Sequence, residues 1–129
     1  MELTYKDVPI EIEFDIDQSK EHIEEDFRVL CEIGIDNLIK EHFIPWLLND
    51  QFKDRDPQKV FEGLRVFEIF YNYGKIIAKY SPTGEENYFG QFEFDFESSN
   101  EYTEDILEAS AMKVYILNGK IVKVEGYDI

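Results

Sequence analysis

The end of the chain constrains the fold most, because its side chains alternate on both sides of one turn signal. Residues 112–125 read MKVYILNGKIVKVE, with Asn118-Gly119 at the centre. Alternation with a period of two is typical of half-buried strands, and Asn-Gly favours a tight hairpin turn. A two-residue turn would set Val114 opposite Lys123 and mix core with surface. We therefore expect a three-residue loop over 117–119, which pairs Ile116 with Lys120, Val114 with Val122, and Met112 with Val124.

Three further segments carry strand patterns. Val8 to Asp17 alternates isoleucine and phenylalanine with acids, and Tyr88 to Glu97 alternates three phenylalanines with polar residues. Leu64 to Tyr80 is predicted to be a second hairpin that turns at Tyr73-Gly74, although residues 64–71 also fit a helical stripe. The phenylalanine-rich strand is expected in the centre of the core.

Helical spacing dominates the first half of the chain. Ser19 is expected to cap a helix that buries Ile23, Phe27, Leu30 and Cys31, directs Glu21, Glu24, Glu25 and Asp26 to water, and ends at Gly34. A second helix is expected to begin at Asp36 and to kink or end at Pro45. Asp56-Pro57 predicts a capped short helix to Gly63, and Thr103 predicts another that directs Ile106, Leu107 and Ala109 to the sheet.

Together these patterns predict an α+β fold. We expect a mainly antiparallel sheet built from the N-terminal strand, two hairpins and the phenylalanine-rich strand, with N-terminal helices packed on one face. The 129 residues fit a single domain over 1–129. The order of the strands and the oligomeric state are left open.

Charge is the extreme feature of the composition. The chain has 13 Lys+Arg against 29 Asp+Glu, a formal net charge of −16. Such a field repels phosphate backbones and attracts basic proteins, so we expect no nucleic-acid partner. No apolar stretch reaches the roughly 20 residues of a membrane span, and no leader is recognised. With the lone cysteine, Cys31, this predicts a cytoplasmic protein that binds no membrane.

Both ends of the chain resemble a known kind of sequence. Residues 89–129, FGQFEFDFESSNEYTEDILEASAMKVYILNGKIVKVEGYDI, and the opening LTYKDVPIEIEF are similar to a bacterial family of small proteins labelled only as a domain of unknown function. The resemblance implies an α+β fold and a bacterial source. It implies no activity, cofactor or catalytic residue.

No strong enzymatic motif is present, so we expect no catalytic residue, metal ligand or cofactor. His22 and His42 are interpreted as surface residues, and Cys31 as a buried apolar one. Glu93, Asp95 and Glu97 share one strand face, and Tyr115 adds aromatic contact area, so these four form the candidate protein-binding site.

The leading hypothesis is a non-catalytic binding module, with an immunity-type inhibitor of a basic toxin as its sharpest form. The alternative is a metal-dependent hydrolase that uses the strand-face carboxylates.

Overall fold

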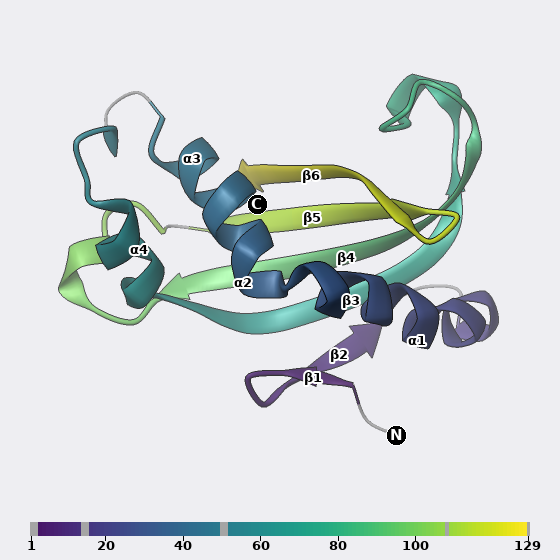
Figure 1. Ribbon diagram of the computed structural model, residues 1–129, viewed down its shortest axis with the longest axis horizontal. Helices are drawn as coiled ribbons and strands as arrows, with labels where there is room; N and C mark the ends of the chain where they lie inside the picture. Colours follow the sequence, from purple (N-terminus) through teal and green to yellow (C-terminus); the bar gives the residue numbers. More distant parts are fainter. Residues whose placement is uncertain (1–2, 14–15, 50–51, 108, 129) are drawn as a thin grey trace.

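In the computed structural model the chain folds into two layers, one sheet and one group of helices (Figure 1). The structure describes residues 3–13, 16–49, 52–107 and 109–128. The strands are β1 (Thr4–Tyr5), β2 (Val8–Ile12), β3 (Leu64–Ile76), β4 (Asn87–Ser98), β5 (Ser110–Leu117) and β6 (Lys120–Asp128). The helices are α1 (Ile16–Ile33), α2 (Ile35–Leu38), α3 (Ile44–Leu47), α4 (Pro57–Gly63), a π-helical turn η1 (Ile39–Phe43), and 3-10 turns η3 (Ala78–Tyr80) and η4 (Glu101–Thr103).

The sheet has six strands in the order β1-β2-β3-β4-β5-β6. Strand β2 pairs with β3 in parallel, and every other neighbouring pair is antiparallel. The parallel pair arises because the helical half of the chain lies between β2 and β3 and returns the chain to the end of the sheet where β2 began. From β3 onward the strands follow one another as a meander. The predicted α+β class and the largely antiparallel sheet are confirmed.

The helices cover one face of the sheet, and the core lies between the two layers. The even-numbered phenylalanines of β4 face this core, as the alternation predicts: Phe92, Phe94 and Phe96 are buried. The Phe96 ring stacks on Phe43 of η1, with centroids 4.1 Å apart, and Phe92 contacts Phe27 of α1. Among the described residues, no helix is long and apolar enough to cross a bilayer.

Pro45 does not end the helical path, contrary to one of the two expected outcomes. A proline lacks the N–H that an α-helix needs, and its ring collides with the carbonyl four residues earlier. Here the turn before it widens into the π-helical η1, where the Ile44 N–H donates to the Ile39 carbonyl. The path then continues through α3, and Leu48 N–H donates to Ile44 O at 2.9 Å. The π turn therefore accommodates the proline.

Both predicted hairpin turns were placed wrongly. Leu64 to Ile76 is a strand, as preferred over a helix, but it runs straight through Tyr73-Gly74 and pairs along its length with β4. In the last hairpin Leu117 pairs with Lys120, so the turn has two residues, not three. A bulge between Tyr115 and Ile116 then shifts the register and sets Val114 opposite Val124. The bulge restores the apolar pairing that a longer loop was expected to provide.

The first strand ends and the first helix begins earlier along the chain than expected. Strand β2 ends at Ile12 and α1 already begins at Ile16, so Ser19 lies inside the helix rather than at its cap. Ser19 is buried, and its Oγ accepts from the Tyr73 N–H at 3.0 Å. Phe14 and Asp15, predicted to continue the strand, lie outside the described residues. The helix does end before Gly34, whose φ of 96° suits a left-handed stop.

Two residues of α1 were assigned to the wrong helix face. Cys31, expected in the core, is exposed. Asp26, expected in water, is buried.

The two predicted caps further along the chain have different outcomes. Gly34 rather than Asp36 occupies the N-cap of α2. The Asp56 cap of α4 is confirmed, since its carboxylate accepts from the Gln58 N–H.

The helix predicted to start at Thr103 is a shorter turn. The 3-10 turn η4 ends at Thr103, and one hydrogen-bonded turn follows it. Ile106 and Leu107 are buried, as expected. Ala109 is exposed and has a positive φ of 53°.

Candidate functional site

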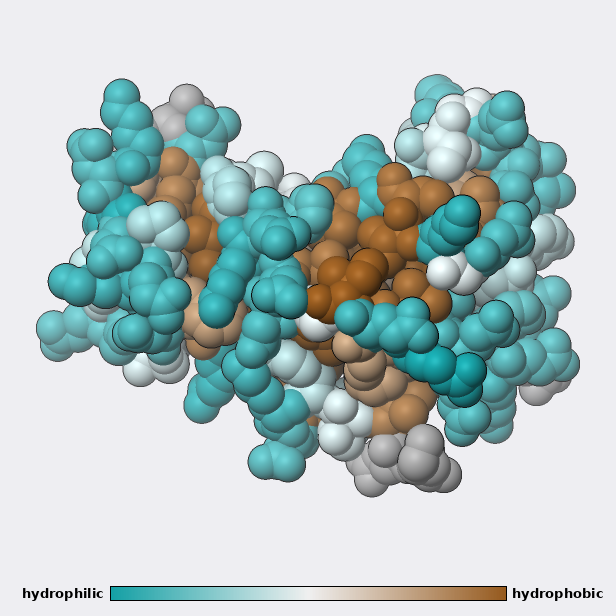
Figure 2. All heavy atoms as spheres, viewed as in Figure 1, coloured by the Kyte–Doolittle hydropathy of each residue, from teal (hydrophilic) through white to brown (hydrophobic). Residues whose placement is uncertain are grey.

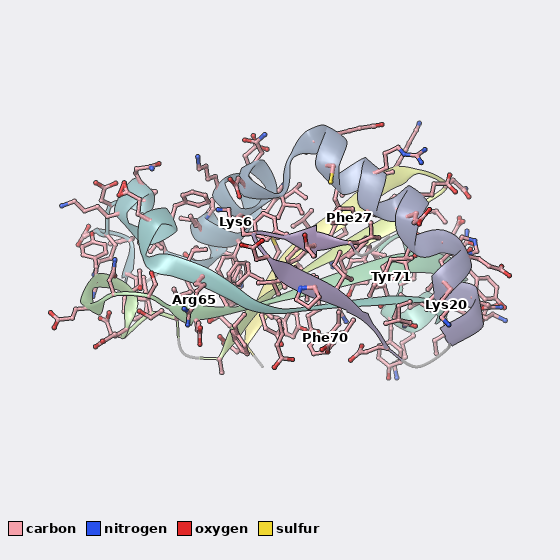
Figure 3. All side chains as sticks on the ribbon, turned by 90° about the horizontal axis from the view of Figure 1, so that it is seen from below. Lys6, Lys20, Phe27, Arg65, Phe70 and Tyr71 are labelled. Carbon is pink, nitrogen blue, oxygen red and sulfur yellow. The ribbon has the colours of Figure 1, made fainter. Side chains whose placement is uncertain are left out.

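The four predicted site residues lie on the sheet face that the helices leave uncovered, which we call the open face. The helix-covered face is identified by Gly90, because a Cβ there would lie 1.9 Å from Asp26 of α1. Side chains alternate along a strand, so the odd-numbered residues of β4 point away from the helices. Figure 3 shows the arrangement: the labelled Phe27 and Phe70 lie on opposite sides of the sheet.

Acidic residues outnumber basic ones on the open face, as the cross-strand register shows. Glu93 is opposite Phe70 on β3 and Lys113 on β5, and Asp95 is opposite Glu68 and Ala111. The pairing places seven acids and four bases on this face: Glu11, Glu13, Glu68, Glu93, Asp95, Glu97 and Glu125, with Arg65, Lys113, Lys120 and Lys123. The open face is therefore negative, in keeping with the whole chain.

Three of the four predicted residues have partners on this face. Tyr127 of β6 donates its hydroxyl to Glu93, and Arg65 pairs with Glu97. Tyr115 is buried, and its hydroxyl donates to Glu125 Oε1 at 2.8 Å. Burial and the adjacent carboxylate raise the pKa of Tyr115 and also that of Tyr127, so both remain hydroxyl donors.

Asp95 differs from the others because it is buried without a full set of partners. Asp95 is only 8% exposed, and no described residue makes a hydrogen bond to its Oδ1. Tyr127 is opposite Ala111 yet reaches Glu93 on β4, so its side chain spans β5 beside Asp95. Burial, a hydrogen bond with Glu93 and the charges of Glu93, Glu68 and Glu13 raise the pKa of Asp95 to about 7.

The N-terminal acidic strand contributes to the same field without touching β4. Strand β3 lies between β2 and β4, so the two acidic strands are not neighbours. Nevertheless Glu13, whose N–H donates to Tyr71 O at 2.8 Å, has a raised pKa, through burial first and the charge of Glu93 second. The carboxylates repel one another across the sheet, and Lys113 offsets part of this repulsion at Glu13.

A second polar site was missed because Asp26 was expected in water. Burial raises the pKa of Asp26, and the Tyr71 hydroxyl, which donates to Asp26 Oδ2 at 2.5 Å, opposes that shift. Asp26 lines a hollow of about 280 Å³, together with His22, Tyr73 and Tyr88. His22 stacks on Tyr73 with ring centroids 3.6 Å apart and planes 3° apart.

One sequence signal could have found Asp26. It lies three residues after Ile23 and four before Leu30, which is the spacing of the buried stripe of this helix. An acid on such a stripe requires a donor in the core, and Tyr71 is that donor. The hollow is slightly smaller than the range of about 300–1,000 Å³ usual for drug-sized ligands.

No metal-binding arrangement occurs in the part of the chain that the structure describes. Within residues 3–13, 16–49, 52–107 and 109–128, no group of three or more histidine, cysteine, aspartate or glutamate side chains is placed to hold a metal ion. His22 and His42 lie at separate hollows, with His42 exposed beside β6.

Comparison of the chain with protein-family models, curated proteins and solved structures found no match. The resemblance to a bacterial family of unknown function therefore stays a prediction.

Proposed function

We propose that this protein is a non-catalytic binding module whose open face receives a basic segment of a partner protein. The observation that carries the proposal is Asp95, whose buried Oδ1 has no hydrogen-bond partner among the described residues and lies near three other acids, Glu93, Glu68 and Glu13. A buried acceptor without a donor costs about 1–3 kcal/mol. An arginine or lysine side chain from a partner supplies donors and positive charge at the place where both are missing.

The shape of the open face also supports binding over catalysis. Its carboxylates lie on or next to strands β2, β3, β4 and β6 rather than in one pocket, and each of the hollows described above lies on the helix side or at an edge. Tyrosines flank the acids: Lys113 Nζ lies 5.8 Å from the ring centroids of both Tyr115 and Tyr127. Tyrosine and arginine contacts are enriched where proteins bind one another.

Binding requires a local rearrangement at Tyr127. The Tyr127 hydroxyl donates to Glu93 and its side chain spans the strand beside Asp95, so a partner cation must displace it to reach Asp95 Oδ1. The displaced hydroxyl is exchanged for a charged donor, which makes a stronger hydrogen bond to a carboxylate. An inhibitor of a basic toxin is the sharpest form of this proposal.

The metal-dependent hydrolase stays a prediction from the sequence that no contact in the described residues favours. A hydrolytic metal needs several ligands converging on one ion. The open-face carboxylates face different cross-strand neighbours, and three of them, Glu93, Glu97 and Glu125, have partners of their own.

A pair of matched variants tests the binding proposal. The open-face variant carries Glu11→Gln, Glu68→Gln and Glu93→Gln, and the control carries Glu21→Gln, Glu24→Gln and Glu32→Gln on the exposed side of α1. Both lose the same charge. Each protein is used to capture proteins from an extract of the native cells, with quantitative mass spectrometry as the readout and circular dichroism to verify folding.

We expect a basic protein that the wild type and the α1 control retain and the open-face variant loses at least tenfold. Association with that protein should slow steeply as salt is added, whereas dissociation changes much less. Equal loss from both variants would mean that net charge alone causes capture, and equal recovery by all three proteins would overturn the proposal.

A further inference from the structure

Strand β6 is a free edge of the sheet. It is the last strand in the order, and β5 is its hydrogen-bonded neighbour. Within the described residues, no backbone hydrogen bond joins β6 to a helix or loop. A strand in this position directs every second N–H and C=O away from the sheet, which makes it a template for another strand.

An exposed apolar groove runs beside this edge on the helix side. Ile33 at the end of α1 is 45% exposed and Val122 of β6 is 37% exposed. The groove has a volume of about 340 Å³ and its apolar lining comes from Ile33, Leu38, Ile121, Val122 and Val124. Figure 2 shows the hydrophobic patch on this side of the molecule, between the helices and β6.

Strand β6 has a balanced charge, whereas the chain as a whole is strongly negative. Over Lys120–Asp128 two lysines balance two acids, whereas the whole chain has a formal net charge of −16. A neutral strand is the part of such a protein where a second negative copy can approach with least repulsion.

The charges at the centre of β6 are complementary when two copies of this strand pair antiparallel. If two copies pair antiparallel about Val124, Lys123 of one copy is opposite Glu125 of the other on both sides of the central pair. If the pairing is centred on Lys123 instead, Lys123 is opposite Lys123. If it is centred on Glu125, Glu125 is opposite Glu125. Opposite charges stabilise a cross-strand pair and like charges destabilise it, so one register is selected.

We propose that β6 pairs with β6 of a second copy of this chain, in the antiparallel register centred on Val124, to form a dimer with a continuous sheet. The three central pairs lie in the regular part of β6, beyond the bulge opposite Tyr115 and Ile116. The twofold axis stands perpendicular to the sheet, so both helical layers lie on the same side and the apolar grooves meet across the interface. The two open faces form one surface on the other side.

Charge variants of β6 test this register. Lys123→Glu sets glutamate opposite Glu125 twice in each interface, whereas the double change Lys123→Glu with Glu125→Lys restores opposite charges in the same register. Lys20→Glu on exposed α1 is the control, because it alters the net charge as much as Lys123→Glu does. Sedimentation equilibrium over a range of protein concentrations gives the dissociation constant of the dimer, and circular dichroism verifies that each variant folds.

We expect a dimer for the wild type and for Lys20→Glu, at least tenfold weaker association for Lys123→Glu, and recovery in the double variant. Added salt up to about 0.15 M should strengthen the dimer, because it screens the repulsion between two negative chains. A wild type that is monomeric at every concentration overturns the proposal, as does a dimer unaffected by Lys123→Glu or not recovered by the double change.

Discussion

At the scale of single residues, Asp95 shows how a surface pattern can produce a buried charge. Its odd-numbered position on β4 directs it away from the core between sheet and helices, yet Asp95 is only 8% exposed. Tyr127 from β6 reaches across β5 to Glu93 on the same face. The carboxylate has lost water without gaining a full set of donors. Its ionisation therefore opposes folding.

The pH dependence of stability follows from the raised pKa of Asp95. The pKa is 3.8 in its ordinary state and about 7 in the fold, so the folded protein holds this proton more tightly than the unfolded chain. Stability from this group is complete below about pH 4, declines as the pH rises toward 7, and is constant above that.

Asp95→Asn should remove this decline. At pH 8 the variant should have a free energy of unfolding about 2–4 kcal/mol higher than the wild type, and near pH 4 the two should agree. Urea unfolding at several pH values measures this difference. Glu97→Gln on the same strand is the control, because an exposed ion pair with Arg65 contributes about 1 kcal/mol or less. A wild type as stable at pH 8 as the Asn variant would contradict the prediction.

At the scale of elements, the contact between α1 and β4 sets the depth of the core. Gly90 allows the helix to approach, because a Cβ at this position would lie 1.9 Å from Asp26 Oδ2 and 3.0 Å from the Tyr71 hydroxyl. The same two side chains form the buried hydrogen bond of 2.5 Å that satisfies Asp26. The glycine, the aspartate and the tyrosine therefore depend on one another although they come from three elements.

Gly90→Ala should destabilise the fold by about 3 kcal/mol, because the new methyl group displaces Asp26 and breaks its bond with Tyr71. Gly74→Ala is the matched control on the neighbouring strand, where a Cβ would meet atoms of Asn72 no closer than 3.5 Å. That change should cost less than about 1 kcal/mol. Chemical unfolding of both variants measures the difference, and equal costs would show that α1 does not pack on β4 this closely.

At the scale of the whole molecule, the net charge works against compactness. A formal charge of −16 on 129 residues repels itself, and seven of the 29 acids lie on one side of a single sheet. The folded state tolerates this because the helices cover the other face and bury the large aromatic residues.

Salt should therefore stabilise the protein. Raising sodium chloride from about 0.01 to 0.15 M shortens the screening length from about 30 to 8 Å, and the melting temperature should rise by several degrees. Differential scanning calorimetry measures this shift, at a protein concentration low enough to keep the chain monomeric. A melting temperature that falls over this range would contradict the expectation.

Some of the structure was determined by the sequence alone, because it depends only on neighbouring residues. The alternation of phenylalanine with acids decides which side of β4 is buried, and the Asp56-Pro57 pair decides where α4 begins. Glu93, Asp95 and Glu97 likewise share one face of β4, as the alternation predicts. These features follow from the two-residue period of a strand and from helix capping, which are local.

The remaining features were decided by tertiary structure, because they depend on which distant segments come together. Gly74 reads as a turn residue but lies within β3, since pairing with β4 continues past it to Ile76. The bulge after Tyr115 aligns Val114 with Val124, and no local pattern indicates where a strand takes an extra residue. Asp95 is buried within a sheet where Tyr127, from β6, reaches Glu93 on β4. Solvent exposure is a property of the assembled sheet, so alternation predicts the side on which a residue lies but not what covers it.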